Sequence, residues 1–123
     1  MNPRRVLIVD DDKVVHTYLK ALLEKEGFKV FSALDAMQAP MMARQVKPDL
    51  IVLDIGLPAG DGYAVHGRIR SMSWTLSIPI LVYTSRAKDE VLQHLPESGD
   101  LAYLSKPASG PDFLAAIHKL LGE

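Results

Sequence analysis

Five short apolar runs recur along the chain, and segments with helical periodicity lie between them. The apolar runs cover residues 6–9, 28–31, 50–53, 78–83 and 101–104. The first, third and fourth runs are almost continuously apolar and rich in Val and Ile. That composition is typical of strands covered on both faces, as in a parallel sheet. The pattern therefore predicts five strands, three of which are buried on both sides.

A helical pattern follows each apolar run. Apolar positions recur at helical spacing within residues 14–23, 36–46, 65–72, 91–95 and 113–121. Gly27 ends the first pattern, Pro111 is suited to the first turn of the last, and Pro40 and Pro96 predict short or kinked helices. Strands joined by helix-length connections pair in parallel through right-handed crossovers. We therefore predict one α/β domain over residues 1–123, a doubly wound three-layer sandwich with a five-stranded parallel sheet and five helices.

Composition narrows the class of protein. The 123 residues are 48% hydrophobic and 24% charged, and they include no cysteine, which excludes disulfides and thiolate metal sites. The net charge of -1 argues against nucleic acid as a direct partner. The apolar runs are far shorter than a membrane span, and Asp10 interrupts the N-terminal run too early for a signal peptide. We expect a cytoplasmic domain with no membrane contact.

Polar residues stand directly after four of the five apolar runs. In chain order they are Asp10-Asp11-Asp12, Asp54, Thr84-Ser85 and Lys106-Pro107. Because ligands of open α/β sheets bind at the carboxyl ends of the strands, we expect these groups to meet in one site. A helix N-cap is the alternative role for an aspartate in such a place, and Asp12 fits it. Three consecutive acids exceed what capping requires.

The charges of these residues favour a metal and a phosphoryl group. Asp10, Asp11 and Asp54 bring three negative charges, and Lys106 brings one positive charge. Clustered carboxylates repel one another, and a divalent cation balances the sum: minus three, plus two and plus one give zero. Oxygen ligands of this kind suit Mg²⁺, which keeps a free face for phosphate. Lys106 and the Thr84 hydroxyl can then hold phosphoryl oxygens, with one carboxylate as acceptor.

With these motifs in order, the chain resembles the chemotaxis-regulator-like receiver domains of two-component response regulators. The matching pieces are residues 6–12 (VLIVDDD), residues 48–58 (PDLIVLDIGLP), Gly60–Gly62, Thr84-Ser85 and residues 103–107 (YLSKP). They follow the order and spacing of that family over nearly the whole chain. The resemblance implies the flavodoxin-like strand order 2-1-3-4-5.

The resemblance also implies a role for each site residue. Asp54 is expected to accept the phosphoryl group, and Asp10, Asp11, Asp54 and the backbone carbonyl of Gly56 are expected to hold Mg²⁺. Gly56 stands where the family usually carries a side chain beside the phosphorylation site. Lys106 is the expected counter-charge, and the bond to Pro107 is expected to be cis.

Thr84 and Tyr103 are expected, again from the resemblance, to form the switch of a signalling protein. The threonine hydroxyl moves toward the phosphoryl group and the tyrosine ring turns inward. The expected partners are a histidine kinase or phosphotransfer protein, and an effector or output domain that reads the surface of the fourth helix, fifth strand and fifth helix. We expect the protein not to be an enzyme in the usual sense, but a phosphoacceptor that assists its own phosphorylation and dephosphorylation.

Three other interpretations remain open at this stage. The pair Asp10-x-Asp12, with Thr84 and Lys106 after later strands, also suits a haloacid-dehalogenase-type aspartyl phosphatase with Asp10 as nucleophile. That class needs a further acid pair after its lysine, and only Asp112 and Glu123 follow Lys106. A flavodoxin needs a less acidic first loop, and a degenerate receiver used only for protein binding would not need every chemical position.

The four histidines have no ligand spacing and are predicted to be exposed or half-buried.

Overall fold

The computed structural model describes residues 3–58 and 62–123, so Gly60 and Asp61 of the Gly60–Gly62 motif lie outside the described residues. The strands are β1 (Arg5–Val9), β2 (Lys29–Ala33), β3 (Leu50–Leu53), β4 (Ile80–Thr84) and β5 (Leu101–Ser105). The helices are α1 (Lys13–Lys25), α2 (Gln38–Val46), α3 (Gly62–Arg70), α4 (Lys88–His94) and α5 (Gly110–Leu120). All neighbouring strands pair in parallel, in the order β2-β1-β3-β4-β5. The predicted fold class and strand order are confirmed.

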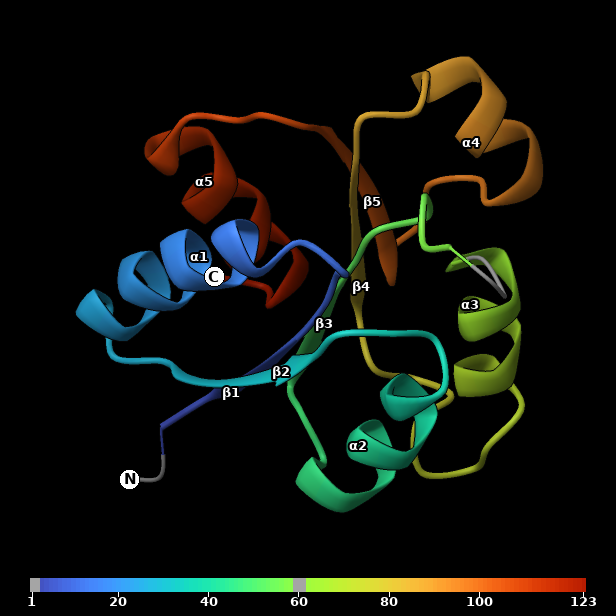
Figure 1. Ribbon diagram of the computed structural model, residues 1–123, viewed down its shortest axis with the longest axis horizontal. Coiled ribbons are helices and arrows are strands. Elements are labelled where there is room, and N and C mark those ends of the chain that lie inside the picture. The colour runs from blue at the N-terminus through green and yellow to red at the C-terminus, as the bar shows by residue number, and fades with distance from the viewer. Residues whose placement is uncertain (1–2, 59–61) are drawn as a thin grey trace.

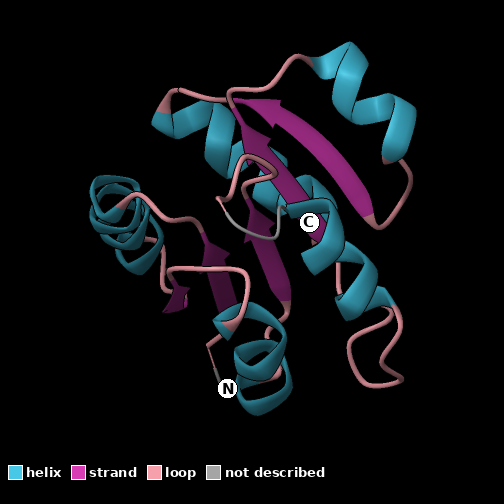
Figure 2. Ribbon diagram, turned by 45° about the vertical axis from the view of Figure 1, so that its right-hand side comes forward, coloured by secondary structure: helices cyan, strands magenta, loops and turns pink. Residues whose placement is uncertain are grey.

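The sheet lies between two layers of helices, as Figures 1 and 2 show. Helices α1 and α5 cover one face, where Leu19 and Phe113 pack on Ile8 and Leu81. Helices α2, α3 and α4 cover the other face. All residues of β3 and β4 are buried, because these central strands have helices on both sides.

Local signals set the ends of α1 and α5. Asp12 is the N-cap of α1, and its Oδ1 accepts a hydrogen bond from the Val14 N–H at 2.9 Å. Ser109 caps α5 in the same way, which places Pro111 second in the helix rather than first as predicted. In α2, Pro40 stands third, where its missing N–H removes no hydrogen bond within the helix. Asp12 and Ser109 each accept a hydrogen bond from an N–H group that has no partner within its helix. Pro40 has no N–H group that would need such a partner.

Several predicted boundaries were wrong by a few residues. Helix α3 ends at Arg70, before Met72, and α4 ends at His94. Strand β2 begins one residue after Phe28, whose N–H still bonds the Leu23 carbonyl and closes the end of α1. None of the helices in the described ranges combines the length and apolar character needed to cross a membrane.

The prediction for one histidine was also wrong. His16 is 7% exposed, and its Nε2 lies 2.6 Å from the backbone oxygen of Asp10. The buried imidazole reaches from the first turns of α1 back to the end of β1. Helical spacing identifies which residues of α1 share a face, but it does not show that the strand end lies over that face.

Candidate functional site

Backbone hydrogen bonds bring the predicted strand-end residues together. The Asp54 N–H donates to the Val9 carbonyl at 3.0 Å, which places Asp54 beside Asp10. The Lys106 N–H donates to the Thr84 carbonyl at 2.9 Å and extends the pairing of β4 with β5. These four polar residues therefore lie at one edge of the sheet because parallel pairing continues past the last residue of each strand.

Asp10, Asp11 and Asp54 form a cluster of carboxylates. One oxygen from each lies within 4.8 Å of the others. Asp10 is 2% exposed and Asp54 is 9% exposed, whereas Asp11 is exposed to solvent. Backbone N–H groups hold the two buried carboxylates: Asp12 donates to Oδ1 of Asp10, and Gly56 donates to Oδ1 of Asp54, both at 2.9 Å. The cluster thus has two fixed carboxylates and one that is open to water.

Lys106 links the two buried carboxylates. Its Nζ lies 2.6 Å from Oδ2 of Asp10 and 3.3 Å from Oδ2 of Asp54. Burial raises the pKa of Asp10 and outweighs the lowering by Lys106 and the Asp12 N–H. Burial alone would lower the pKa of Lys106, but the hydrogen bonds and charges of the two carboxylates raise it. The ammonium is therefore held in its charged form between two acids.

The donor set fits a hard divalent cation. Three carboxylates and one ammonium leave two uncompensated negative charges at the site. All the side-chain donors are oxygens, which Mg²⁺ prefers, and Asp11 leaves the cluster open on the solvent side. Asp10, Asp11 and Asp54 are the side chains that would hold the ion, which would bring positive charge to any phosphoryl oxygens placed there.

Thr84 and Tyr103 do not bond each other but bond the same residue, Arg86. Thr84 is fully buried, and its Oγ1 accepts a hydrogen bond from the Arg86 N–H at 3.3 Å. The half-buried Tyr103 donates its hydroxyl proton to the Arg86 carbonyl at 2.5 Å. The loop after β4 is therefore held on one side by Thr84 and on the other by Tyr103.

Two residues that support the site received no role in the sequence interpretation, although Gly62 belongs to a motif that it named. A Cβ on Gly62 would lie 2.5 Å from the backbone oxygen of Asp54 and from Cα of Ile55, so only glycine fits there without a shift. The buried His16 contacts the Asp10 carbonyl. The glycine of the Gly60–Gly62 motif was a visible signal, whereas His16 differs from its neighbours only through its place in the fold. The expected cis bond between Lys106 and Pro107 is present.

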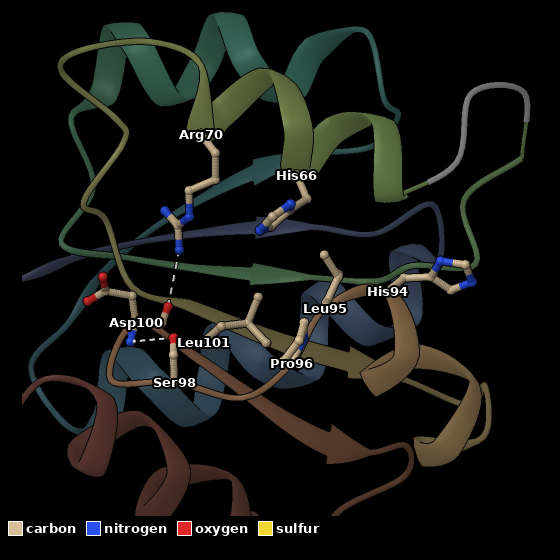
Figure 3. A pocket seen from close by; sticks show the side chains of 8 residues that line it. All are labelled: His66, Arg70, His94, Leu95, Pro96, Ser98, Asp100 and Leu101. Carbon is tan, nitrogen blue, oxygen red and sulfur yellow. Dashed lines mark hydrogen bonds between the residues drawn. The ribbon is translucent and has the colours of Figure 1, made fainter.

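A separate cavity of about 200 Å³ lies at the opposite edge of the sheet, between α3, α4 and the start of β5. Figure 3 shows Arg70 and His66 pointing toward this cavity from α3. The Arg70 guanidinium donates hydrogen bonds to the backbone oxygens of Leu76, Ile78 and Asp100. Burial, followed by the charge of Arg70, lowers the pKa of His66. Arg70 therefore joins the end of α3 to the segments that precede β4 and β5, and none of the carboxylates of the cluster lines this cavity.

Comparison with known proteins identifies a family. Residues 6–118 match the family model of the response regulator receiver domain. The chain is 31% identical to the polar-differentiation response regulator DivK of Brucella anthropi, over 98% of both chains. It is 36% identical to the DNA-binding dual master transcriptional regulator RpaA of Synechocystis, over 95% of this chain and 48% of that protein. The chain thus spans about half the length of RpaA.

Solved structures agree with this result. The chemotaxis protein CheY4 of Vibrio cholerae superposes with a TM-score of 0.90 at 25% identity, over 97% of this chain and 99% of that one. The receiver domain of the sensor histidine kinase PA1611 of Pseudomonas aeruginosa gives a TM-score of 0.87 at 27% identity, over 99% and 100%. That structure has a magnesium ion coordinated in its active site cleft.

Proposed function

Since this chain belongs to the response regulator receiver domains of two-component systems, we propose that Asp54 accepts a phosphoryl group in an Mg²⁺-dependent step. Receiver domains of this family are signalling proteins that interact with histidine kinases and effectors. The observation that carries the proposal is the position of Lys106 Nζ, 2.6 Å from Asp10 and 3.3 Å from Asp54. With Asp11 in the same cluster, the site holds an acceptor, a counter-charge and oxygen ligands for a cation.

The transfer itself is a substitution at phosphorus. An Asp54 carboxylate oxygen attacks the phosphorus of a partner phosphohistidine, the P–N bond breaks, and the imidazole leaves and takes up a proton from water. Lys106 is close enough to Asp54 to donate a hydrogen bond to a phosphoryl oxygen as the new P–O bond forms. Mg²⁺, held by Asp10, Asp11, Asp54 and the Gly56 carbonyl, supplies further positive charge when bound. A small acyl phosphate can replace the phosphohistidine, with its carboxylate as leaving group.

Asp54 suits the acceptor role better than Asp10, the nucleophile of the phosphatase interpretation. In both carboxylates Oδ1 accepts from a backbone N–H and Oδ2 lies near Lys106, but Lys106 is closer to Asp10, at 2.6 Å, than to Asp54, at 3.3 Å. Asp10 is also the more buried of the two, at 2% exposed. Asp54 is also largely buried at 9%, but it lies against Gly56, which carries no side chain to cover it. A receiver with Asp54 as acceptor is therefore our conclusion.

Intact-mass measurement tests the acceptor. Incubation with acetyl phosphate and Mg²⁺ should add one phosphoryl group to the wild-type protein and none to Asp54→Ala. Asp12→Asn is the matched control, because Asp12 belongs to the same acidic run but serves as the N-cap of α1, and asparagine still caps. It should be labelled like the wild type. A phosphoryl adduct that persists in Asp54→Ala would contradict the assignment.

We further propose that Thr84 and Tyr103 transmit phosphorylation to the surface formed by α4, β5 and α5. The buried Thr84 hydroxyl would exchange its contact with the Arg86 N–H for a hydrogen bond to the phosphoryl group. Tyr103, which bonds the same loop, would follow it. A cavity of about 380 Å³ lies beside Tyr103 between β5 and α5, on the surface that we expect an effector or output domain to read.

The energy of this switch must be shared among several residues. Moving a two-state equilibrium from 1:99 to 99:1 takes about 5.5 kcal/mol. One charge-assisted hydrogen bond from Thr84 contributes only about 1.5–3 kcal/mol. Lys106 and the backbone after Asp54 must therefore contribute the rest. We propose that the protein is cytoplasmic and that its phosphodonor is a histidine kinase or a phosphotransfer protein.

Amide exchange of residues 85–106, with and without beryllofluoride, tests this coupling. Thr84→Ala should still be phosphorylated at Asp54 but should show a much smaller change in protection. Thr84→Ser keeps the hydroxyl and should respond like the wild type. A full wild-type response in Thr84→Ala would show that the coupling does not pass through this hydroxyl.

A further inference from the structure

An arginine lies on the open side of the acceptor carboxylate. Gly56 stands two residues after Asp54, and a Cβ built on it would lie 3.4 Å from Oδ1 of Asp54. The same point is 3.8 Å from Nε of Arg86. The space that a side chain at position 56 would take therefore separates the Arg86 guanidinium from the acceptor, and glycine leaves that space empty.

The backbone of Arg86 is fixed, while its side chain is free to reorient. Thr84 Oγ1 accepts from its N–H at 3.3 Å, and Tyr103 donates to its carbonyl at 2.5 Å. The residue is exposed overall, so its guanidinium can turn toward a new partner at Asp54 without leaving a packed core. Arginine is also well suited to the task, because its planar fork can donate two parallel hydrogen bonds to one phosphoryl group.

Phosphorylation makes the net charge of the site more negative, and this favours movement of the Arg86 guanidinium toward Asp54. Before phosphorylation, the three carboxylates, Lys106 and a bound Mg²⁺ sum to zero. Phosphorylation replaces the single charge of Asp54 with the two charges of an acyl phosphate dianion. The sum of the site then falls to minus one. Arg86 is a cation beside the acceptor that can return this sum to zero.

We propose that Arg86 is a phosphoryl-binding residue: its guanidinium crosses the space left by Gly56 and donates hydrogen bonds to the phosphoryl oxygens on Asp54. This inference rests on the proposed function and adds a ligand for the phosphoryl group that is separate from Thr84 and Lys106. Arg86 thereby joins the phosphoryl group to the loop that Thr84 and Tyr103 hold.

Beryllofluoride binding measures this contact without turnover. Titration of the Mg²⁺-loaded protein with beryllofluoride should give a Kd about tenfold higher in Arg86→Gln, which is about 1.4 kcal/mol. Arg86→Lys keeps the charge but loses the fork, so its loss should be smaller. Lys88→Gln is the matched control, because it removes the same charge two residues away, at the exposed start of α4. Its Kd should stay within twofold of the wild-type value.

Mg²⁺ affinity serves as the check on the fold and metal site. It should not fall in Arg86→Gln, because this variant removes a cation near the carboxylates. Equal beryllofluoride affinity in Arg86→Gln and wild type would overturn the proposal. An equal loss of affinity in Lys88→Gln would also overturn it, because it would indicate a long-range effect of positive charge rather than a direct contact. If the wild-type protein bound no beryllofluoride and Asp54 took no phosphoryl group, the proposed function would fail as well.

Discussion

Gly62 lies so close to the backbone that carries Asp54 that no side chain fits between them. In Gly62→Ala, the new methyl carbon would start 2.5 Å from the Asp54 backbone oxygen and 2.5 Å from Cα of Ile55. Both contacts must open to at least 3.0 Å, a shift of 0.5 Å or more. Neither neighbour is a side chain that can rotate away. The shift must therefore move α3 away from the sheet or move the backbone of the acceptor itself.

The expected cost follows from this geometry. Overpacking of a well-packed interior costs about 1–3 kcal/mol. The higher helix propensity of alanine offsets up to about 1 kcal/mol of this loss in stability, because Gly62 begins α3. We expect Gly62→Ala to lower the free energy of unfolding by about 1–2 kcal/mol. Because Asp54 and Ile55 are the residues displaced, the Mg²⁺-dependent gain in stability should also shrink.

Urea unfolding with and without Mg²⁺ measures both effects. Gly67→Ala is the matched control, since it makes the same substitution in the same helix, and a Cβ at Gly67 would meet no atom within 4 Å. It should raise the stability by up to about 1 kcal/mol and leave the effect of Mg²⁺ unchanged. Equal stabilisation by both substitutions would refute the reasoning, because it would mean that α3 does not press on the Asp54 backbone.

Three further predictions follow from the site. Mg²⁺ at a hundredfold excess over its Kd should stabilise the wild-type protein by about 2.7 kcal/mol, measured by urea unfolding, and Asp11→Asn should lose most of that gain; equal gains would argue against this ligand. The pKa of Lys106 is raised above 10.5, so its contribution to stability is present below that pH and is lost as the pH rises through the raised value. The stability advantage of wild type over Lys106→Met, measured by urea unfolding from pH 9 to 11.5, should therefore shrink at the alkaline end, and a constant difference would contradict this. His16→Leu removes the donor to the Asp10 carbonyl and should cost about 1–3 kcal/mol, while His16→Gln, which can still donate, should cost less in the same assay.

Much of the fold could be predicted because its signals are local. The run of residues 50–53 matches β3 throughout, since a central strand buried on both faces must be apolar at every position. Edge strand β2 was predicted to begin one residue early and to end two residues early, because only part of it is buried and its pattern is weaker. The end of α3 was missed for a similar reason, as Met72 continues the apolar spacing after the helical hydrogen bonds have ended.

The candidate site, like the fold, could be predicted only in part from the sequence. Asp10, Asp11, Asp54 and Lys106 could be predicted to meet, because each stands at the end of an apolar run and parallel strands end at one edge. How they meet is a tertiary property: Lys106 bonds both Asp10 and Asp54, while Asp11 stays exposed. The roles of Thr84 and Tyr103 came from the family resemblance, and the structure adds that both bond Arg86.

By itself, the sequence of this protein determined the five βα units, the chemistry at the strand ends and a charge balance that favours a divalent cation. These depend on residue types and on spacing along the chain, which a sequence displays directly. Only the tertiary structure decided that His16 lies beneath Asp10, that Gly62 presses on the Asp54 backbone and that Arg86 stands beside Gly56. Each of these contacts joins residues from different elements, so its distance depends on how helices and loops pack on the sheet, and no local pattern encodes that packing.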